Sequence, residues 1–129
     1  MNYLLDTHVL LWSLMEPSNL SRAVAEALED GRNSLYASAV SLWEIAIKTR
    51  LGKLRLEGIG LADVPPVLDQ LDIELLPMSA EDAIGYASLA EPSHKDPFDR
   101  MLVCQAMAHK LTILTPDRLI RQYGVPCLW

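Results

Sequence analysis

The chain of 129 residues contains few of the residues that form disulfide staples or soft-metal sites. It has two cysteines, Cys104 and Cys127, and three histidines, and none of them stand at the spacing of a zinc site. Both thiols are expected to be reduced, as in a cytosolic protein. No apolar run approaches the roughly 18 residues of a membrane span, and no signal-peptide pattern opens the chain. The sequence therefore predicts a cytoplasmic protein without a membrane segment.

Positive charge is also scarce, with 11 Lys and Arg against 17 Asp and Glu and a net charge of -6. This balance argues against a surface that attracts nucleic acid everywhere. Four cations nevertheless fall close together: Lys48, Arg50, Lys53 and Arg55. Two interpretations stay open for them, a solvated helix end or an edge that faces phosphate groups. The glycines of residues 52–60 show neither the dinucleotide-binding nor the Walker spacing.

Short apolar runs alternate with helical patterns along the chain. Strands are expected at residues 3–5, 35–37, 73–76 and 111–114, with a last small one near residue 127. Helices are expected at residues 9–14, 21–30, 38–51, 63–71, 79–90, 96–109 and 117–123. Because no hairpin pattern or repeat appears, the alternation predicts βαβ units. The predicted fold is a single α/β domain over residues 1–129, a three-layer α/β/α sandwich around a parallel sheet of four to five short strands.

Acidic residues stand at the start of the helix predicted at residues 96–109. Asp96 followed by Pro97 indicates an N-cap with proline at the first helical position. Asp99 suits the helix dipole in the first turn. It also shares a face with Leu102 and Val103, which is expected to pack inward, so its carboxylate needs a partner.

Glu44 is the other anomalous acid, because apolar residues surround it in the helical pattern. One interpretation is a capping box, since Ser41 and Glu44 match S-x-x-E. If the helix begins at Ser38 instead, Glu44 lies between Val40 and Ile47 on a buried stripe. A carboxylate there would be costly to bury alone, so a cation is expected beside it.

Right-handed crossovers place the carboxyl ends of all parallel strands at one edge of the sheet. Asp6 and Asp117 follow strands at that edge, and the helices that carry Glu44 and Asp99 start from it. Four ionised carboxylates repel one another and need a cation. Because no histidine or cysteine stands at ligand spacing, an all-oxygen site for Mg²⁺ or Mn²⁺ is expected. Such a site can activate water for phosphodiester hydrolysis.

These residues resemble the PIN-domain nucleases, and among them the VapC-like toxins of bacterial and archaeal toxin–antitoxin pairs. The resemblance rests on LLDTHVLLW, SAVSLWEIAIKTRLGKL, DPFDRMLVCQA and TPD, in this order along the chain. It places the catalytic and metal-binding acids of the family at Asp6, Glu44, Asp99 and Asp117. Further residues are expected to bind substrate or to support the acids: Thr7, Ser41, Asp96, Arg100 and Thr115. The resemblance implies magnesium-dependent cleavage of RNA, a cognate VapB-like antitoxin and a homodimer.

Two other classes of protein share some of these features. A receiver-like phosphorylation module also gathers acids and Mg²⁺ at this edge, but it needs a lysine after a late strand, where this chain has Thr115-Pro116-Asp117. A PIN-like module that binds RNA or protein without cutting is the second alternative, and the complete set of acids speaks against it. A divalent-dependent cleavage assay separates it from a nuclease.

Several residues are expected to have packing or surface roles. Trp12, Trp43, Met101 and Met107 are expected in the core, and Glu81 and Asp82 as complements to a helix dipole. His8 is expected near the pocket as a packing residue, and His94 in an exposed loop.

Overall fold

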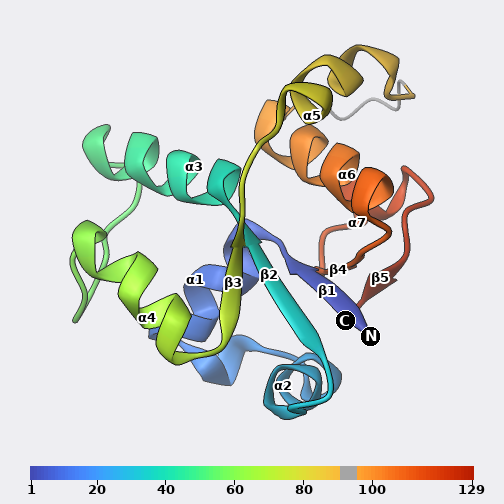
Figure 1. The fold of residues 1–129 in the computed structure, drawn as a ribbon. Coiled ribbons are helices and arrows are strands. Elements are labelled where there is room, and N and C mark those ends of the chain that lie inside the picture. The colour runs from blue at the N-terminus through green and yellow to red at the C-terminus, as the bar shows by residue number, and fades with distance from the viewer. Residues whose placement is uncertain (91–95) are drawn as a thin grey trace.

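The computed structural model describes residues 1–90 and 96–129, so the expectation for His94 lies outside the described residues. Its parallel strands are β1 (Asn2–Leu5), β2 (Ser34–Ser38), β3 (Ile73–Leu76), β4 (Thr112–Leu114) and β5 (Cys127–Leu128). They form one sheet of five strands in the order β3-β2-β1-β4-β5 (Figure 1). The expected parallel sheet is therefore confirmed.

Helices connect the strands, close to the expected positions. They are α1 (Thr7–Met15), α2 (Arg22–Glu29), α3 (Ala39–Arg50), α4 (Val64–Gln70), α5 (Ala80–Gly85), α6 (Pro97–His109) and α7 (Arg118–Arg121). Short 3₁₀ turns occupy Pro17–Asn19, Leu61–Asp63 and Tyr86–Ser88. The helix expected at 79–90 thus ends as an α-helix at Gly85, a residue with low helix propensity. Within residues 1–90 and 96–129, no helix is long and apolar enough to cross a membrane.

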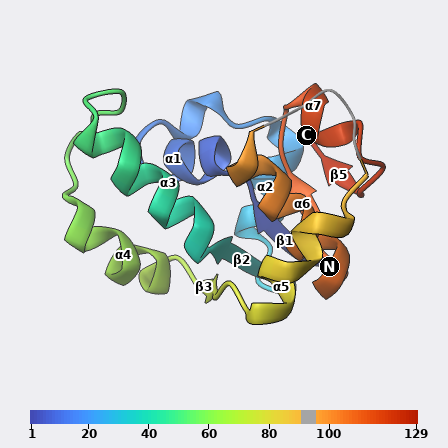
Figure 2. The ribbon, with the colours of Figure 1, turned by 90° about the horizontal axis from the view of Figure 1, so that it is seen from above.

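The strands carry apolar side chains on both faces, as buried parallel strands do. Leu5 and Leu35 belong to one core cluster together with residues of α1 to α4, and Leu4 and Ile113 belong to another with residues of α6 and α7. Seen from above, α1, α3 and α4 lie on one side of the strands and α5 and α6 on the other (Figure 2). This confirms the three-layer α/β/α arrangement.

The strand order reverses beside β1. The chain steps from β1 to β2 and β3 on one side, and then crosses to β4 and β5 on the other side. The amide of Asp6 donates to the carbonyl of Leu114 at 3.1 Å, so the ends of β1 and β4 lie side by side. In open α/β sheets, ligands bind in the crevice at such a switch point. The fold therefore puts Asp6 and the segment after β4 at the expected binding edge.

The core expectations are only partly correct. Met101 is buried, and Trp12 is half-buried against the first core cluster. Trp43 is 59% exposed and Met107 is 47% exposed, so their expected places in the core are wrong. The apolar pattern of α3 and α6 extends almost around each helix, but neighbouring elements cover only part of each surface. Periodicity alone did not identify the uncovered part.

Candidate active site

Asp6 is held in a fixed position at the end of β1. Its side chain is almost fully buried and caps α1, because Oδ1 accepts from the amide of Val9 at 2.8 Å. Oδ2 accepts a short hydrogen bond from the hydroxyl of Thr115. Burial raises the pKa of the Asp6 carboxyl and the charge of Asp117 adds to this, while the bonds from Thr115 and Val9 oppose it. The structure therefore contains a buried acid that is costly to ionise.

Asp117 follows β4 as the N-cap of α7, where Oδ1 accepts from the amide of Leu119 at 2.8 Å. Its own amide donates to Thr115 Oγ1 at 3.0 Å. Thr115 thus contacts both acids and supports the Asp6–Asp117 pair across the switch point.

Glu44 lies in the middle of α3 and is 3% exposed. The helix begins directly after β2, with Ser38 as its N-cap, whose Oγ accepts from the amide of Val40 at 3.0 Å. The alternative capping box of Ser41 and Glu44 is therefore wrong, because Ser41 already lies inside the helix. The buried Ser41 hydroxyl instead accepts a hydrogen bond from Thr7 Oγ1 at 3.0 Å, which joins α3 to the start of α1.

The cation expected beside Glu44 is Lys48, one turn later in the same helix. Its ammonium group makes an ion pair with Glu44 Oε2. The other oxygen, Oε1, is buried and has no hydrogen-bond partner among the described residues. The hydrogen bond to Glu44 raises the pKa of Lys48, and the charges of Asp96 and Asp99 add to this effect. Three acids therefore act on one lysine.

Asp96 and Asp99 both stand at the start of α6. Asp96 is the N-cap, with Oδ1 accepting from the amides of Phe98 at 2.9 Å and Asp99 at 3.2 Å. The interpretation of Asp96-Pro97 as a helix start is confirmed. Asp99 is half-buried in the first turn. The expected position of Asp99 in the first turn of this helix, before the buried Leu102, is also confirmed.

Arg100 is 4% exposed and lies between two aromatic rings. Its guanidinium donates to the hydroxyl of Tyr123 at 3.0 Å and lies 5.0 Å from the ring centre of Tyr86. These contacts join α6 to the segments that follow α5 and α7. The expected contact of Arg100 with substrate stays a prediction.

A cavity of about 330 Å³ lies beside Glu44. The residues that line it come from α1, α3 and the following loop: Thr7, His8, Leu11, Glu44, Ile45, Lys48, Lys53 and Leu54. His8 therefore lies at the pocket, as expected, and its ring also packs 5.9 Å from that of Trp12. Lys48 and Lys53, two of the four clustered cations, therefore line the same cavity as the candidate catalytic acid Glu44.

The charge of Asp117 acts on Asp6, and the charges of Glu44, Asp96 and Asp99 all act on Lys48. Within residues 1–90 and 96–129, no three Asp, Glu, His or Cys side chains lie close enough together to hold a metal ion. The donor chemistry nevertheless fits a hard divalent cation, because Glu44 has a buried oxygen without a partner and the others are carboxylates. Convergence of all four acids on one ion stays a prediction.

Two features escaped the sequence analysis. The Glu44–Lys48 pair has the i, i+4 spacing that favours helical ion pairs, so its spacing was a usable signal. Asp82 lies in the first turn of α5, as expected for a complement to the helix dipole, but it is also only 4% exposed and forms a capping box with Ser79. The pattern S-x-x-D at the helix start predicts that capping box, but not its burial.

A model of the PIN domain matches residues 3–126, and the chain belongs to the PIN domain family. It is similar to Ribonuclease VapC22 of Mycobacterium tuberculosis, with 30% identity over 125 residues that make up 95% of this chain and 92% of that protein. The family resemblance read from the motifs is confirmed, and the receiver-like alternative is excluded.

Solved structures share the fold at lower identity. The structure of VapBC2 from Rickettsia felis bound to a promoter DNA fragment matches with a TM-score of 0.71 and 17% identity, covering 100% of this chain and 98% of that one. FitAcB from Neisseria gonorrhoeae matches with a TM-score of 0.61 and 24% identity, covering 98% of this chain and 96% of that one.

Proposed function

We propose that the protein is a divalent-metal-dependent endoribonuclease, the toxin of a toxin–antitoxin pair, which acts in the cytoplasm. The observation that carries this proposal is the placement of buried Asp6 and Glu44 at the ligand-binding edge of a PIN domain. Burial of two carboxylates costs free energy of folding, and buried acids at a switch point are typical of functional sites. The similarity to a ribonuclease, VapC22, supports the same activity here.

Asp6, Glu44, Asp99 and Asp117 would hold Mg²⁺ or Mn²⁺. Such an ion lowers the pKa of a bound water and neutralises charge on the reacting phosphate. The chain supplies fixed carboxylates, since Val9 and Thr115 immobilise Asp6 through hydrogen bonds. Thr7 and Ser41 hold α1, which Asp6 caps, against α3, which carries Glu44.

The RNA backbone is proposed to run from the acids across the end of α3. Lys53 lines the cavity beside Glu44, and Arg50 and Arg55 are exposed near it in sequence. These side chains offer positive charge to phosphate groups next to the reacting one. Lys48 is instead held by Glu44.

The nuclease proposal is tested by RNA cleavage with and without chelator. Cleavage is expected to stop in excess EDTA and to resume with Mg²⁺ or Mn²⁺, because the ion would lower the pKa of the attacking water and neutralise charge on the phosphate. Glu44→Gln serves as the control for contaminating nuclease, since it keeps the shape of the side chain and removes its charge. Undiminished cleavage in EDTA would contradict metal dependence. Intact protein that binds RNA but never cuts it would favour the alternative of a non-catalytic module.

We further propose a VapB-like antitoxin as partner, in line with the similar structure of VapBC2 from Rickettsia felis. An arginine or lysine of the antitoxin is expected to enter the acid pocket beside Asp6 and Asp99, where a guanidinium can pair with two carboxylates. Replacing the basic residues of the antitoxin's inhibitory segment should relieve inhibition. The mass of the purified complex is expected to include two copies of this chain. Inhibition that survives those replacements would contradict the mechanism.

A further inference from the structure

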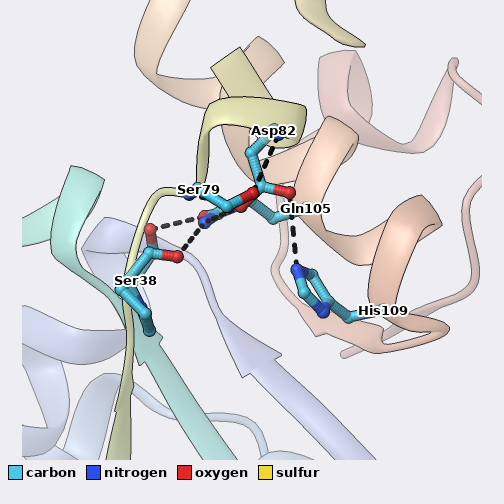
Figure 3. Close-up of polar contacts among 6 residues, drawn as sticks. Ser38, Ser79, Asp82, Gln105 and His109 are labelled. Atoms are coloured by element: carbon cyan, nitrogen blue, oxygen red, sulfur yellow. Dashed lines mark hydrogen bonds and ion pairs between the residues drawn. The ribbon is translucent and has the colours of Figure 1, made fainter. Parts of the chain in front are cut away.

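A buried hydrogen-bond network links α6 to the end of β2 and to α5 (Figure 3). Its centre is Gln105 of α6, which is fully buried. The amide oxygen accepts from Ser38 Oγ at 2.5 Å. The amide nitrogen donates to Asp82 Oδ2 at 3.1 Å and to the carbonyl of Pro77 at 3.2 Å. One side chain of α6 thus contacts the end of β2, the segment after β3 and helix α5.

The orientation of the Gln105 amide is fixed by Asp82. Burial opposes ionisation of Asp82, but hydrogen bonds from Ser79 and Gln105 and the nearby charge of His109 outweigh it, so the pKa of Asp82 is lowered. An ionised carboxylate only accepts hydrogen bonds. Gln105 must therefore turn its NH₂ group to Asp82 and its oxygen to Ser38. The hydroxyl of Ser38 must then donate to Gln105, while it accepts from the amide of Val40 at 3.0 Å.

Both ends of the Ser38–Gln105 bond lie on helices that carry candidate catalytic acids. Ser38 is the N-cap of α3, and Glu44 lies further along that helix. Gln105 lies in α6, which carries Asp99 in its first turn. The apolar cluster of Val40, Met101 and Cys104 also packs α3 against α6, but apolar contact has no direction. The hydrogen bond fixes one point of α6 against the start of α3.

We propose that Gln105 is a positioning residue for the metal-binding acids, because its amide ties Ser38, the N-cap of α3, to α6 and so sets Glu44 relative to Asp99. This role rests on the proposed metal-dependent function. Asp82 acts one step further away, since it determines which end of the amide faces Ser38. Partners that hydrogen-bond metal-binding side chains directly commonly change metal affinity 10- to 100-fold when they are replaced, and Gln105, which acts through the two helices, is expected to have an effect at the low end of that range.

The test compares Gln105→Met and Ser38→Ala with Ser21→Ala. Methionine keeps the length of glutamine without its hydrogen bonds. Ser21 is a matched control, because it caps α2 through the amide of Val24 at 3.1 Å, as Ser38 caps α3, and α2 carries none of the candidate acids. Mn²⁺ binding, measured by calorimetric titration, is expected to weaken about tenfold in the first two variants. Ser21→Ala should bind Mn²⁺ like the native chain although it also loses a cap.

A second readout needs no metal. The ring of Trp43 on α3 lies 5.5 Å from that of Phe98 on α6, edge to face, so the Trp43 indole N–H signal reports on the contact between these helices. We expect this signal, assigned with Trp43→Phe, to shift in Gln105→Met and Ser38→Ala and not in Ser21→Ala. The double variant should shift little further, because both changes break the same bond.

An unshifted indole signal and native Mn²⁺ affinity in Gln105→Met would overturn the positioning role. Effects that simply add in the double variant would do so as well. If Gln105→Met fails to fold, Ser38→Ala against Ser21→Ala still decides the question. A native chain that binds no Mn²⁺ would contradict the proposed function instead, and the indole comparison would still test the link between α3 and α6.

Discussion

Asp6→Asn is expected to abolish RNA cleavage and to make the metal-free protein more stable. Removal of one metal-binding carboxylate forfeits several kcal/mol of charge stabilisation in the transition state, so the rate should fall on the order of a thousandfold. The gain in the free energy of unfolding is expected to be about 1 kcal/mol, a size typical when a group held for function is removed. Asparagine is as good an N-cap as aspartate, so the start of α1 should persist.

The sign of the stability change follows from the pKa of Asp6. Its raised pKa in the folded protein means that the native state binds this proton more tightly than the unfolded state does. The contribution of Asp6 to stability therefore falls as pH rises from its unfolded pKa through its folded pKa, and at neutral pH the ionised group is a cost. Replacement by neutral asparagine removes that cost.

Asp82→Asn is the matched control for stability, because Asp82 is equally buried but has a lowered pKa. Its contribution is present above the unfolded pKa and is lost as pH falls through the folded pKa, so at neutral pH this change should destabilise the protein. Thermal melts in EDTA at neutral pH compare the two variants with the native chain, and a cleavage assay in Mg²⁺ follows Asp6→Asn. An Asp6→Asn protein that is less stable than the native chain and still cuts RNA would mean that Asp6 serves only as the N-cap of α1.

Replacement of three clustered basic residues by glutamate is expected to weaken RNA binding strongly. It should also make the binding affinity less dependent on salt concentration. The change is Arg50→Glu, Lys53→Glu and Arg55→Glu together. Each phosphate contact that is lost removes about one unit from the slope of log affinity against log salt, so the slope should fall by up to about three. Lys48 is left unchanged, because its reversal would place a second carboxylate beside buried Glu44.

The measurement is RNA binding in EDTA across a salt series, where binding is separated from cleavage. Arg22→Glu with Arg32→Glu is the charge control, since both arginines are exposed and stand at either end of α2, which lies below the sheet and away from α3 in Figure 1. The control should leave the slope near the native value. An equal slope of log affinity against log salt in the triple variant and the native chain would indicate that RNA binds to another surface.

Local patterns in the sequence were sufficient for the elements and for the places of the acids. Alternating apolar runs and helical periods gave five parallel strands and their connecting helices, because parallel strands are buried on both faces. Asp96 and Pro97 marked the start of α6, since a cap and a proline act within a few residues. The order of the motifs along the chain was also sufficient to predict membership of the PIN domain family.

Only the tertiary structure decided which of these residues are in contact. Ser38 rather than Ser41 caps α3 because β2 ends directly at the helix, and Trp43 is exposed although its ring contacts Phe98 of α6. The link from Asp82 through Gln105 to Ser38 joins residues far apart in the sequence, as does the bond from Thr115 to Asp6. Local periodicity reports which residues can face inward, whereas burial and hydrogen-bond partners depend on the packing of distant segments, which no short stretch of this chain encodes.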